Sequence, residues 1–319
     1  MKIIFAGTPE FAAKHLKKLL QKKYNIVAVL TKPDQPLNRK KKKKSSPVKI
    51  LAKKMSIPIL QPKKFEKEEL KKTIQILKNL NPDILIIVSY GIILKKRIIK
   101  IFPLGGINVH ASLLPRWRGA SPIQQSILSG DKKTGISIIS INEKMDEGDI
   151  FCNEEQKINN NETTLSLTKK LENIGCKLLI STLKKIKKKE HVLTKQNHSF
   201  ATYCKKIKKT DGKINWLLTA QEINRKIRAY IPWPTSYFVI NQMHIKVFQS
   251  SVIIEKKPRN QEHKNIGSII SIKKDGIQIQ TSKNILKIEK IQMPGKKIIT
   301  ISDLINSNNN LFYLGLILK

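Results

Sequence analysis

The first half of the chain alternates short apolar runs with amphipathic segments. Runs rich in Ile, Leu and Val predict strands at 2–6, 25–31, 57–60, 83–89, 107–109, 135–141 and 149–152. Amphipathic spacing predicts helices at 9–20, 47–55, 66–79, 120–128 and 163–188. Thr8-Pro9 and Ser46-Pro47 are suited to begin the first two helices, and Gly175 predicts a break in the last. Strands that alternate with helices indicate an α/β fold with a Rossmann-like, doubly wound and mostly parallel sheet.

The run at 83–89 is apolar on both faces, as is typical of a strand inside a parallel sheet. Such sheets bind ligands outside the carboxyl ends of their strands. We therefore expect Gly7, Tyr90-Gly91, His110 and the loop 142–148 at that end of the sheet. A dinucleotide site is not favoured, because Gly7 stands alone where a G-x-G-x-x-G turn would be needed.

The pattern changes after about residue 210. A capping box, Thr219 with Glu222, predicts a helix to about Tyr230. Short β-type runs follow, at 236–240, 244–254, 267–272, 276–281 and 284–293. They predict a small C-terminal β-barrel of the oligonucleotide-binding (OB-like) kind, although the barrel could equally be a stable appendage. We expect a catalytic domain at 1–188, a linker at 189–209 and the barrel domain at 210–319.

The charge of the chain is strongly positive, with 62 Lys+Arg against 23 Asp+Glu and a formal net charge of +39. Such a surplus favours a polyanionic partner, nucleic acid above all, while heavy Lys, Ile and Asn usage also fits compositional drift. Six consecutive cations interrupt the loop 33–46, and we predict that they bind nucleic acid: Arg39, Lys40, Lys41, Lys42, Lys43 and Lys44. The competing interpretation is a drifted linker without contacts.

Other classes are not favoured by the sequence. The three cysteines form no C-x-x-C pair and fit a reducing cytosol, and no clustered His/Cys spacing predicts a metal site. The apolar run at the start of the chain is too short for a signal peptide, and the most apolar segment, 84–94, is too short to span a bilayer. We expect a cytoplasmic monomer without membrane contact.

The stretch 105–122, GGINVHASLLPRWRGASP, carries polar residues that a core would not need. Asn108 and His110 are two positions apart, so on a strand they point to the same side. An amide donor beside an imidazole suits chemistry at a carbonyl, which needs a donor for the oxyanion and a base for the proton. A carboxylate such as Asp146 could orient His110. The alternatives are that the pair satisfies backbone groups and that Asp146 faces water.

The run N-V-H-A-S-L-L-P-R-W-R-G-A-S-P-I, with M-D-E-G-D later, resembles the folate-dependent formyltransferases. The resemblance implies that Asn108, His110 and Asp146 are the catalytic residues. It also implies that a loop lines the pocket for 10-formyltetrahydrofolate, formed by Ser112, Leu113, Leu114 and Pro115. Formyl transfer is then the expected activity, with no metal required.

Further segments resemble the branch of that family that formylates charged initiator tRNA. They are F-A-G-T-P-E-F-A, T-K-P-D-Q-P with a basic stretch and S-P-V-K, V-S-Y-G-I-I-L, I-N-W and I-R-A-Y-I-P-W-P. The basic loop departs from the family, because lysines replace almost all of its acidic and glycine content. This branch implies initiator methionyl-tRNA as the partner, held in part by the barrel. A formyltransferase for a small sugar or purine intermediate and a non-catalytic RNA-binding protein stay as alternatives.

Overall fold

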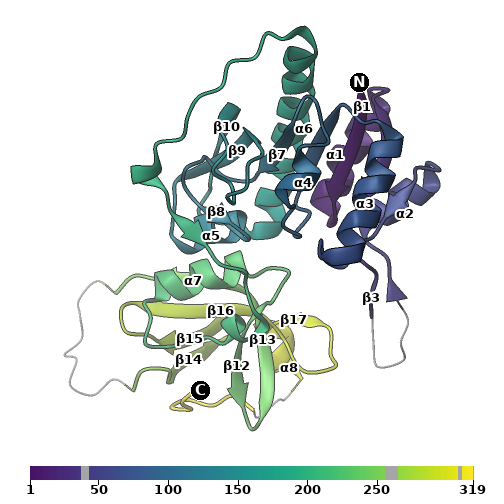
Figure 1. Cartoon of the computed structure of the whole chain (residues 1–319). Coiled ribbons are helices and arrows are strands. Elements are labelled where there is room, and N and C mark those ends of the chain that lie inside the picture. The colour runs from purple at the N-terminus through teal and green to yellow at the C-terminus, as the bar shows by residue number, and fades with distance from the viewer. Residues whose placement is uncertain (37–42, 256–264, 308–310, 319) are drawn as a thin grey trace. The chain divides into compact units, whose positions relative to one another are not determined.

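The computed structural model describes residues 1–36, 43–255, 265–307 and 311–318 (Figure 1). Contacts between Cα atoms divide the chain into two compact units. The first unit comprises 1–122, 133–157 and 168–205. The second unit comprises 123–132, 158–167 and 206–319. Residues 189–205, inside the expected linker, therefore group with the first unit.

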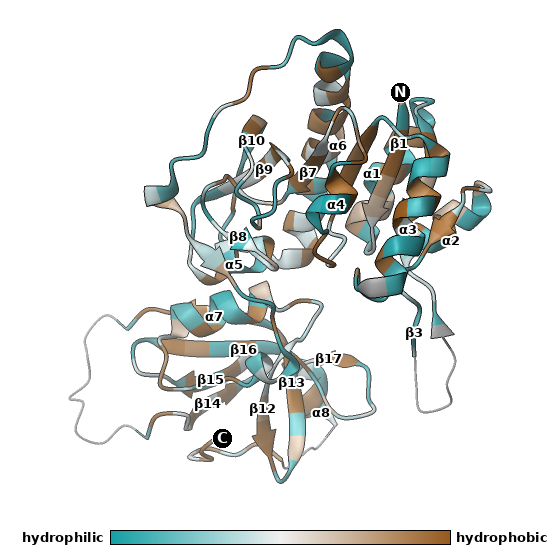
Figure 2. Ribbon diagram, in the orientation of Figure 1, coloured by the Kyte–Doolittle hydropathy of each residue, from teal (hydrophilic) through white to brown (hydrophobic). Residues whose placement is uncertain are grey.

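A seven-stranded sheet forms the centre of the first unit, in the order β10-β9-β7-β6-β1-β2-β5. Its strands are β1 (Lys2–Gly7), β2 (Asn25–Leu30), β5 (Ile59–Leu60), β6 (Ile84–Val88), β7 (Gly106–His110), β9 (Lys133–Ser140) and β10 (Ile150–Lys157). The pairings from β5 to β7 are parallel, whereas β9 runs antiparallel to β7 and to β10. Figure 2 shows the apolar character of β1 and β7 inside the unit. The predicted mostly parallel, Rossmann-like α/β fold is confirmed.

The helices of this half of the chain are α1 (Glu10–Gln21), α2 (Pro47–Lys54), α3 (Lys67–Leu80), α4 (Lys96–Ile99), α5 (Pro122–Leu128) and α6 (Thr164–Lys188). The hydroxyl of Ser46 caps α2 by accepting from the Lys49 amide, as its sequence predicts. Thr8 does not cap α1; its hydroxyl donates to the carbonyl of Tyr90, and Pro9 is the N-cap. The end of β1 is thereby tied to the loop after β6.

The predicted break at Gly175 is wrong, because α6 is continuous from Thr164 to Lys188. A Cβ at Gly175 would lie 2.4 Å from the Nε2 atom of His15 on α1 and 3.3 Å from a methyl of Val109 on β7. This glycine therefore allows α1, α6 and the sheet to approach closely, rather than bending the helix.

The opposite face of the sheet packs on α3 and α4. An apolar cluster there joins Ile4 and Leu85 of the strands to Leu77 of α3 and Ile98 of α4. Side chains alternate along β7, so Asn108 and His110 point away from the face that Val109 shares with α1 and α6.

The second unit is built on an antiparallel sheet in the order β12-β13-β16-β15-β14, with β17 paired to β16. Its elements are α7 (Ala220–Ala229), β12 (Ser236–Ile240), β13 (Met243–Ile253), β14 (Ile269–Lys273), β15 (Gly276–Gln280), β16 (Ile285–Gln292), β17 (Ile298–Thr300) and α8 (Ile301–Asn306). The capping box of Thr219 and Glu222 begins α7 as predicted. A core that includes Trp216, Phe238 and Leu304 joins the sheet to both helices. The five predicted strands are present, and β17 and α8 were not foreseen.

Within the described ranges, the chain offers no helix that is both long and apolar enough to cross a membrane.

Candidate active site

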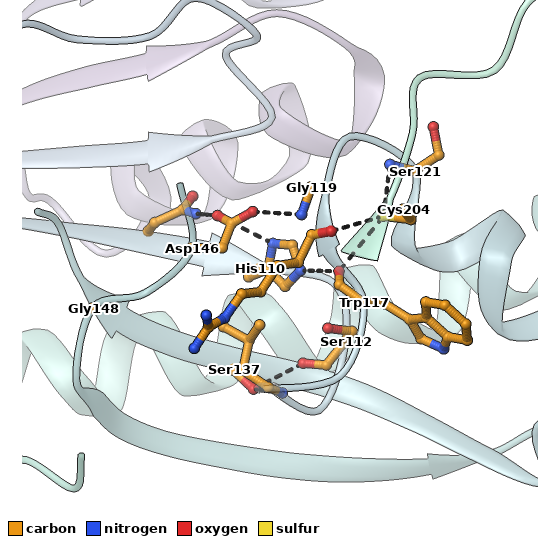
Figure 3. A network of polar contacts seen from close by, with 12 residues as sticks. His110, Ser112, Trp117, Gly119, Ser121, Ser137, Asp146, Gly148 and Cys204 are labelled. Carbon is orange, nitrogen blue, oxygen red and sulfur yellow. Dashed lines mark hydrogen bonds and ion pairs between the residues drawn. The ribbon is translucent and has the colours of Figure 1, made fainter. Parts of the chain in front are cut away.

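Strand β7 places the first two candidate residues. Asn108 pairs in register with Ile87 of β6, and His110 pairs with Ser137 of β9. His110 is only 5% exposed, so its polar ring needs partners within the protein. Both ring nitrogens face polar atoms of two different loops (Figure 3).

Asp146 reaches this strand from the loop after β9. Its Oδ1 accepts a hydrogen bond from Asn108 Nδ2 at 3.1 Å and lies 3.5 Å from Nδ1 of His110. Its Oδ2 accepts from the backbone N–H of Gly119 at 2.8 Å. The predicted convergence of Asn108, His110 and Asp146 is therefore present, and Figure 3 shows the contacts of the Asp146 carboxylate with Gly119 and His110. An acid facing bulk water does not describe it.

The expected position of the loop 142–148 at the carboxyl ends of the strands is wrong. Because β9 is antiparallel, its last residue, Ser140, pairs with Ile107 near the start of β7. The loop nevertheless reaches Asn108 and His110, since the carboxylate of Asp146 extends to both side chains. Asp146 has a φ of +57°, a left-handed conformation that is uncommon for a residue with a side chain.

The contacts of His110 determine which of its ring nitrogens carries a hydrogen. Its Nε2 lies 2.9 Å from the carbonyl oxygen of Trp117, and a carbonyl can only accept, so Nε2 carries a hydrogen. The neutral ring then directs the lone pair of Nδ1 at the carboxylate of Asp146. The carboxylate of Asp146 therefore lies beside the ring nitrogen that does not donate to Trp117.

The loop after β7 is held from inside the unit. Ser137 Oγ donates to the carbonyl of Ser112 at 2.8 Å and accepts from the amide of Leu114 at 3.0 Å. Ser112 and Leu114 are buried, while Leu113 and Pro115 are half-buried. The Leu114–Pro115 peptide bond is cis. The two hydrogen bonds of Ser137 fix the backbone of this loop, while Leu113 and Pro115 keep part of their apolar surface exposed.

A later segment, residues 194–204, completes the loop. Strand β11 (Tyr203–Cys204) pairs in parallel with β8 (Arg118–Gly119). Thr202 accepts from the amide of Trp117 at its hydroxyl and from the amide of Arg118 at its carbonyl, both at 2.9 Å. Burial raises the pKa of the Cys204 thiol, and the charge of Asp146 raises it further. The neutral thiol accepts from the amide of Ser121 and donates to the carbonyl of Arg118.

Arg118 is the largest side chain among those that the described structure buries almost completely, at 1% exposure. Its guanidinium donates to the side-chain oxygen of Gln196, from Nε at 3.1 Å and from Nη2 at 2.7 Å. It also donates to the hydroxyl of Tyr203 and lies 3.3 Å from a carboxylate oxygen of Glu147. In the sequence, Arg118 stands out as one of seven arginines among 62 basic residues and by its place in the motif loop. Its partner Gln196 is 78 positions away, and no local pattern predicts the contact.

Only part of the basic loop can be placed. Arg39, Lys40, Lys41 and Lys42 lie outside the described residues, while Lys43 and Lys44 form β4 (Lys43–Lys44), paired with β3 (Gln35–Pro36). The base of this hairpin is anchored by Asp34, which accepts from Lys49 Nζ at 2.7 Å and from Gln61 at 3.2 Å. The bond from Lys49 lowers the pKa of Asp34. Among the residues placed in the structure, none form a group of three His, Cys, Asp or Glu that could hold a metal.

The sheet, the site on β7 and the attached second unit define a class of enzyme. The chain belongs to the formyl transferase family: the family model for formyl transferases matches residues 1–183, and the model for their C-terminal domain matches residues 206–309. The resemblance inferred from the motif is thereby confirmed.

Two curated relatives narrow the class. The chain is 46% identical over 316 residues to a methionyl-tRNA formyltransferase of Buchnera aphidicola subsp. Schizaphis graminum, covering 99% of this chain and 98% of that protein. It is 49% identical over 311 residues to the methionyl-tRNA formyltransferase of Buchnera aphidicola subsp. Baizongia pistaciae, covering 97% and 94%.

Solved structures share the fold. One is the sugar 3N-formyl transferase WlaRD, with a TM-score of 0.66 at 20% identity, covering 93% of this chain and 99% of that chain. Another is the phosphoribosylglycinamide formyltransferase from Bacillus halodurans, with a TM-score of 0.51 at 22% identity, covering 58% and 95%.

Proposed function

We propose that this protein transfers the formyl group of 10-formyltetrahydrofolate to the α-amino group of methionyl-initiator tRNA, and so supports translation initiation. The observation that carries this proposal is identity of 46–49% to methionyl-tRNA formyltransferases over almost the whole chain. The sugar transferase is only 20% identical, which favours the tRNA acceptor over a small sugar. A purely RNA-binding protein would not need Asn108, His110 and Asp146 in contact.

Asn108, His110 and Asp146 are proposed as the catalytic residues. The amide of Asn108 has two N–H groups and uses one on Asp146, so the second can donate to the oxygen that becomes anionic when the amine attacks. The acceptor amine must lose one proton as the new C–N bond forms. The pair of His110 and Asp146 can take that proton and return it to the folate nitrogen as its bond to the formyl carbon breaks.

The folate donor is assigned to the loop Ser112, Leu113, Leu114 and Pro115. Support comes from the fixed backbone beside His110 and the half-buried apolar side chains of Leu113 and Pro115. The sugar transferase WlaRD has been solved with 5-N-formyl-THF, which shows that a member of this fold binds a formylated folate. Supply of the formyl group is the chemistry that this donor contributes; no metal is part of the proposal.

The basic residues Arg39–Lys44 are proposed to contact the tRNA, as part of a chain whose formal net charge is +39. We further propose that the protein works as a monomer in the cytoplasm. Both the formyltransferase site and the basic segment belong to the same chain, so a second copy is not needed to complete either.

The test is formyl transfer by the purified protein. Methionyl-initiator tRNA, a dTDP-linked amino sugar and glycinamide ribonucleotide are offered separately, each with and without 10-formyltetrahydrofolate. We expect formylmethionyl-tRNA only when donor and charged tRNA are both present. Formylation of the sugar or the ribonucleotide instead would overturn the assigned acceptor. Binding of tRNA without any formyl transfer would overturn the proposal that the protein is an enzyme.

A further inference from the structure

Gln196 lies outside the formyltransferase motif, yet its side chain touches the loop of Asp146 and the buried Arg118. Its Nε2 donates to the carbonyl of Asp146 at 2.8 Å and to that of Gly148 at 2.7 Å. Its Oε1 accepts from Nε and Nη2 of Arg118. The amide is 6% exposed and uses both hydrogens and both lone pairs.

The chemistry of the neighbours fixes the orientation of this amide. Turning it over would direct its NH₂ group at a guanidinium, which has only donors, and its oxygen at two carbonyls, which have only lone pairs. The contact is therefore specific for a neutral amide between a cation and two carbonyls. A carboxylate at position 196 could accept from Arg118, but its oxygens would be repelled by the backbone carbonyls of Asp146 and Gly148.

Asp146 needs such support because of its backbone. Its φ of +57° is uncommon for a non-glycine residue, and its carboxylate must meet Asn108, His110 and the Gly119 amide together. Gln196 binds the carbonyl of that same residue, and Arg118 precedes Gly119 in the chain. The series of hydrogen bonds from Arg118 through Gln196 to Asp146 thus fixes the carboxylate relative to the Gly119 amide that donates to it.

We propose that Gln196 is a positioning residue of formyl transfer, which acts by fixing the Asp146 carboxylate against His110 and Gly119 and is itself oriented by Arg118. The inference rests on the proposed function, since Asp146 is taken as part of the reacting group. Gln196 touches neither substrate; it determines how often the carboxylate is in place when the substrates are bound.

The variant Gln196→Glu keeps the acceptor for Arg118 and removes both donors to the loop. Gln196→Met removes the donors without adding charge, and it serves if the glutamate variant does not fold. The matched control is Gln75→Glu, which makes the same substitution on α3, where the exposed side chain of Gln75 donates a hydrogen bond to Asn79. Thermal unfolding identifies which variants are folded.

Two readouts test the proposal. For either folded Gln196 variant we expect kcat for charged tRNA to fall about 10- to 100-fold, with KM for donor and tRNA within about twofold, because a misplaced reacting group affects the chemical step. Without substrates, hydrogen exchange of the Gly119 amide should speed up at least about tenfold, since that amide depends on the carboxylate remaining in place. Gln75→Glu should change neither quantity.

An unchanged kcat, or a normal exchange rate at Gly119, in a folded Gln196 variant would overturn the positioning role. A loss confined to KM would do the same, because it would indicate a binding role. The exchange measurement needs no substrate, so it stands even if the wild-type protein proves to formylate another acceptor. Failure of the proposed function would appear instead in the wild-type transfer assay.

Discussion

At the scale of single residues, His110 is the group whose loss should reveal the chemistry most directly. His110→Ala removes the imidazole that faces Asp146, so kcat for formyl transfer should fall by on the order of 10²–10⁴. Binding of tRNA should change little, because we expect it to depend on the basic residues Arg39–Lys44 and not on His110. Single-turnover formylation and tRNA binding, measured on the same preparations, check this prediction.

The control for that substitution is His191→Ala, since His191 is exposed and packs on Phe151 away from β7. Near-normal turnover by His110→Ala would contradict the assignment of the base.

His15 gives a second residue-scale prediction, about acid stability. Burial lowers the pKa of its imidazole from the ordinary value of 6.5 to about 4. The Nδ1 atom lies 2.7 Å from the carbonyl of Phe11 and donates to it, while Nε2 is buried with no hydrogen-bond partner among the described residues. The unfolded chain takes up a proton near pH 6.5, whereas the folded chain does not. The stability that the neutral, buried ring contributes is therefore complete above pH 6.5 and is lost as the pH falls toward 4.

The lost stability should amount to about 3 kcal/mol over that window, from roughly 1.4 kcal/mol per unit of pKa difference. Denaturant unfolding of wild type and His15→Leu at a series of pH values measures it. The difference between the two proteins removes the contribution of carboxylates that titrate in both. An equal pH dependence in the two proteins would show that the ring is not buried in its neutral form.

The sequence indicated the proposed catalytic residues, but not the residues that hold them in place. Asn108 and His110 could be read from spacing on one strand, and the motif resemblance added Asp146. Arg118 and Gln196 could not be paired from the sequence, because their contact depends on how a loop and a segment 78 positions apart fold together. The same holds for the carbonyl of Trp117, whose role comes from backbone geometry and not from its indole.

At the scale of elements, α6 shows local preference giving way to packing. Glycine is a poor helix former and predicts a break, yet α6 continues through Gly175 because a side chain there would collide with His15. The length of strand β10 was underestimated, since the sequence predicted a strand only at 149–152. Its later residues, 153–157, are polar because the strand lies at the edge of the sheet, so they lack the apolar run expected of a buried strand.

Gly175→Ala tests that view of α6. Helix propensity alone would stabilise the protein by about 1 kcal/mol, whereas the collision with His15 should destabilise it by about 1–3 kcal/mol. We expect the collision to dominate, because the nearest ring atom would lie 2.4 Å from the new Cβ. Thermal or urea unfolding gives the sign.

The double variant His15→Ala/Gly175→Ala is the matched control. With the ring removed, the alanine at 175 should become neutral or stabilising relative to His15→Ala alone, which gives a favourable coupling energy in a double-mutant cycle. Destabilisation of equal size in both backgrounds would mean that the glycine serves something other than contact with His15.

At the scale of the whole molecule, the formal charge of +39 makes salt dependence the quantity to measure. Replacing Lys40–Lys44 with serine and glycine should weaken tRNA binding. The log–log salt slope should become smaller by about two to four phosphate equivalents, while affinity for the folate donor stays the same. Binding at several salt concentrations separates this contact from a general loss of affinity.

A variant of equal charge provides the control. Five exposed lysines at and beyond the end of α6 are changed to glutamine: Lys184, Lys185, Lys187, Lys188 and Lys189. If the basic loop contacts the tRNA, the loop variant should lose more of the slope than this control. Equal losses would mean that total charge matters and that the position of the lysines does not.

The pairing of β11 with β8 has a consequence for biosynthesis. A ribosome makes this chain from residue 1 onward, so Asn108, His110 and Asp146 emerge long before the segment that holds their loop in place. A nascent chain can carry all three proposed catalytic side chains and still lack the pairing of β11 with β8 until Cys204 has left the exit tunnel. A fragment cut at residue 188 would lack the strand that pairs with β8 in the loop around His110.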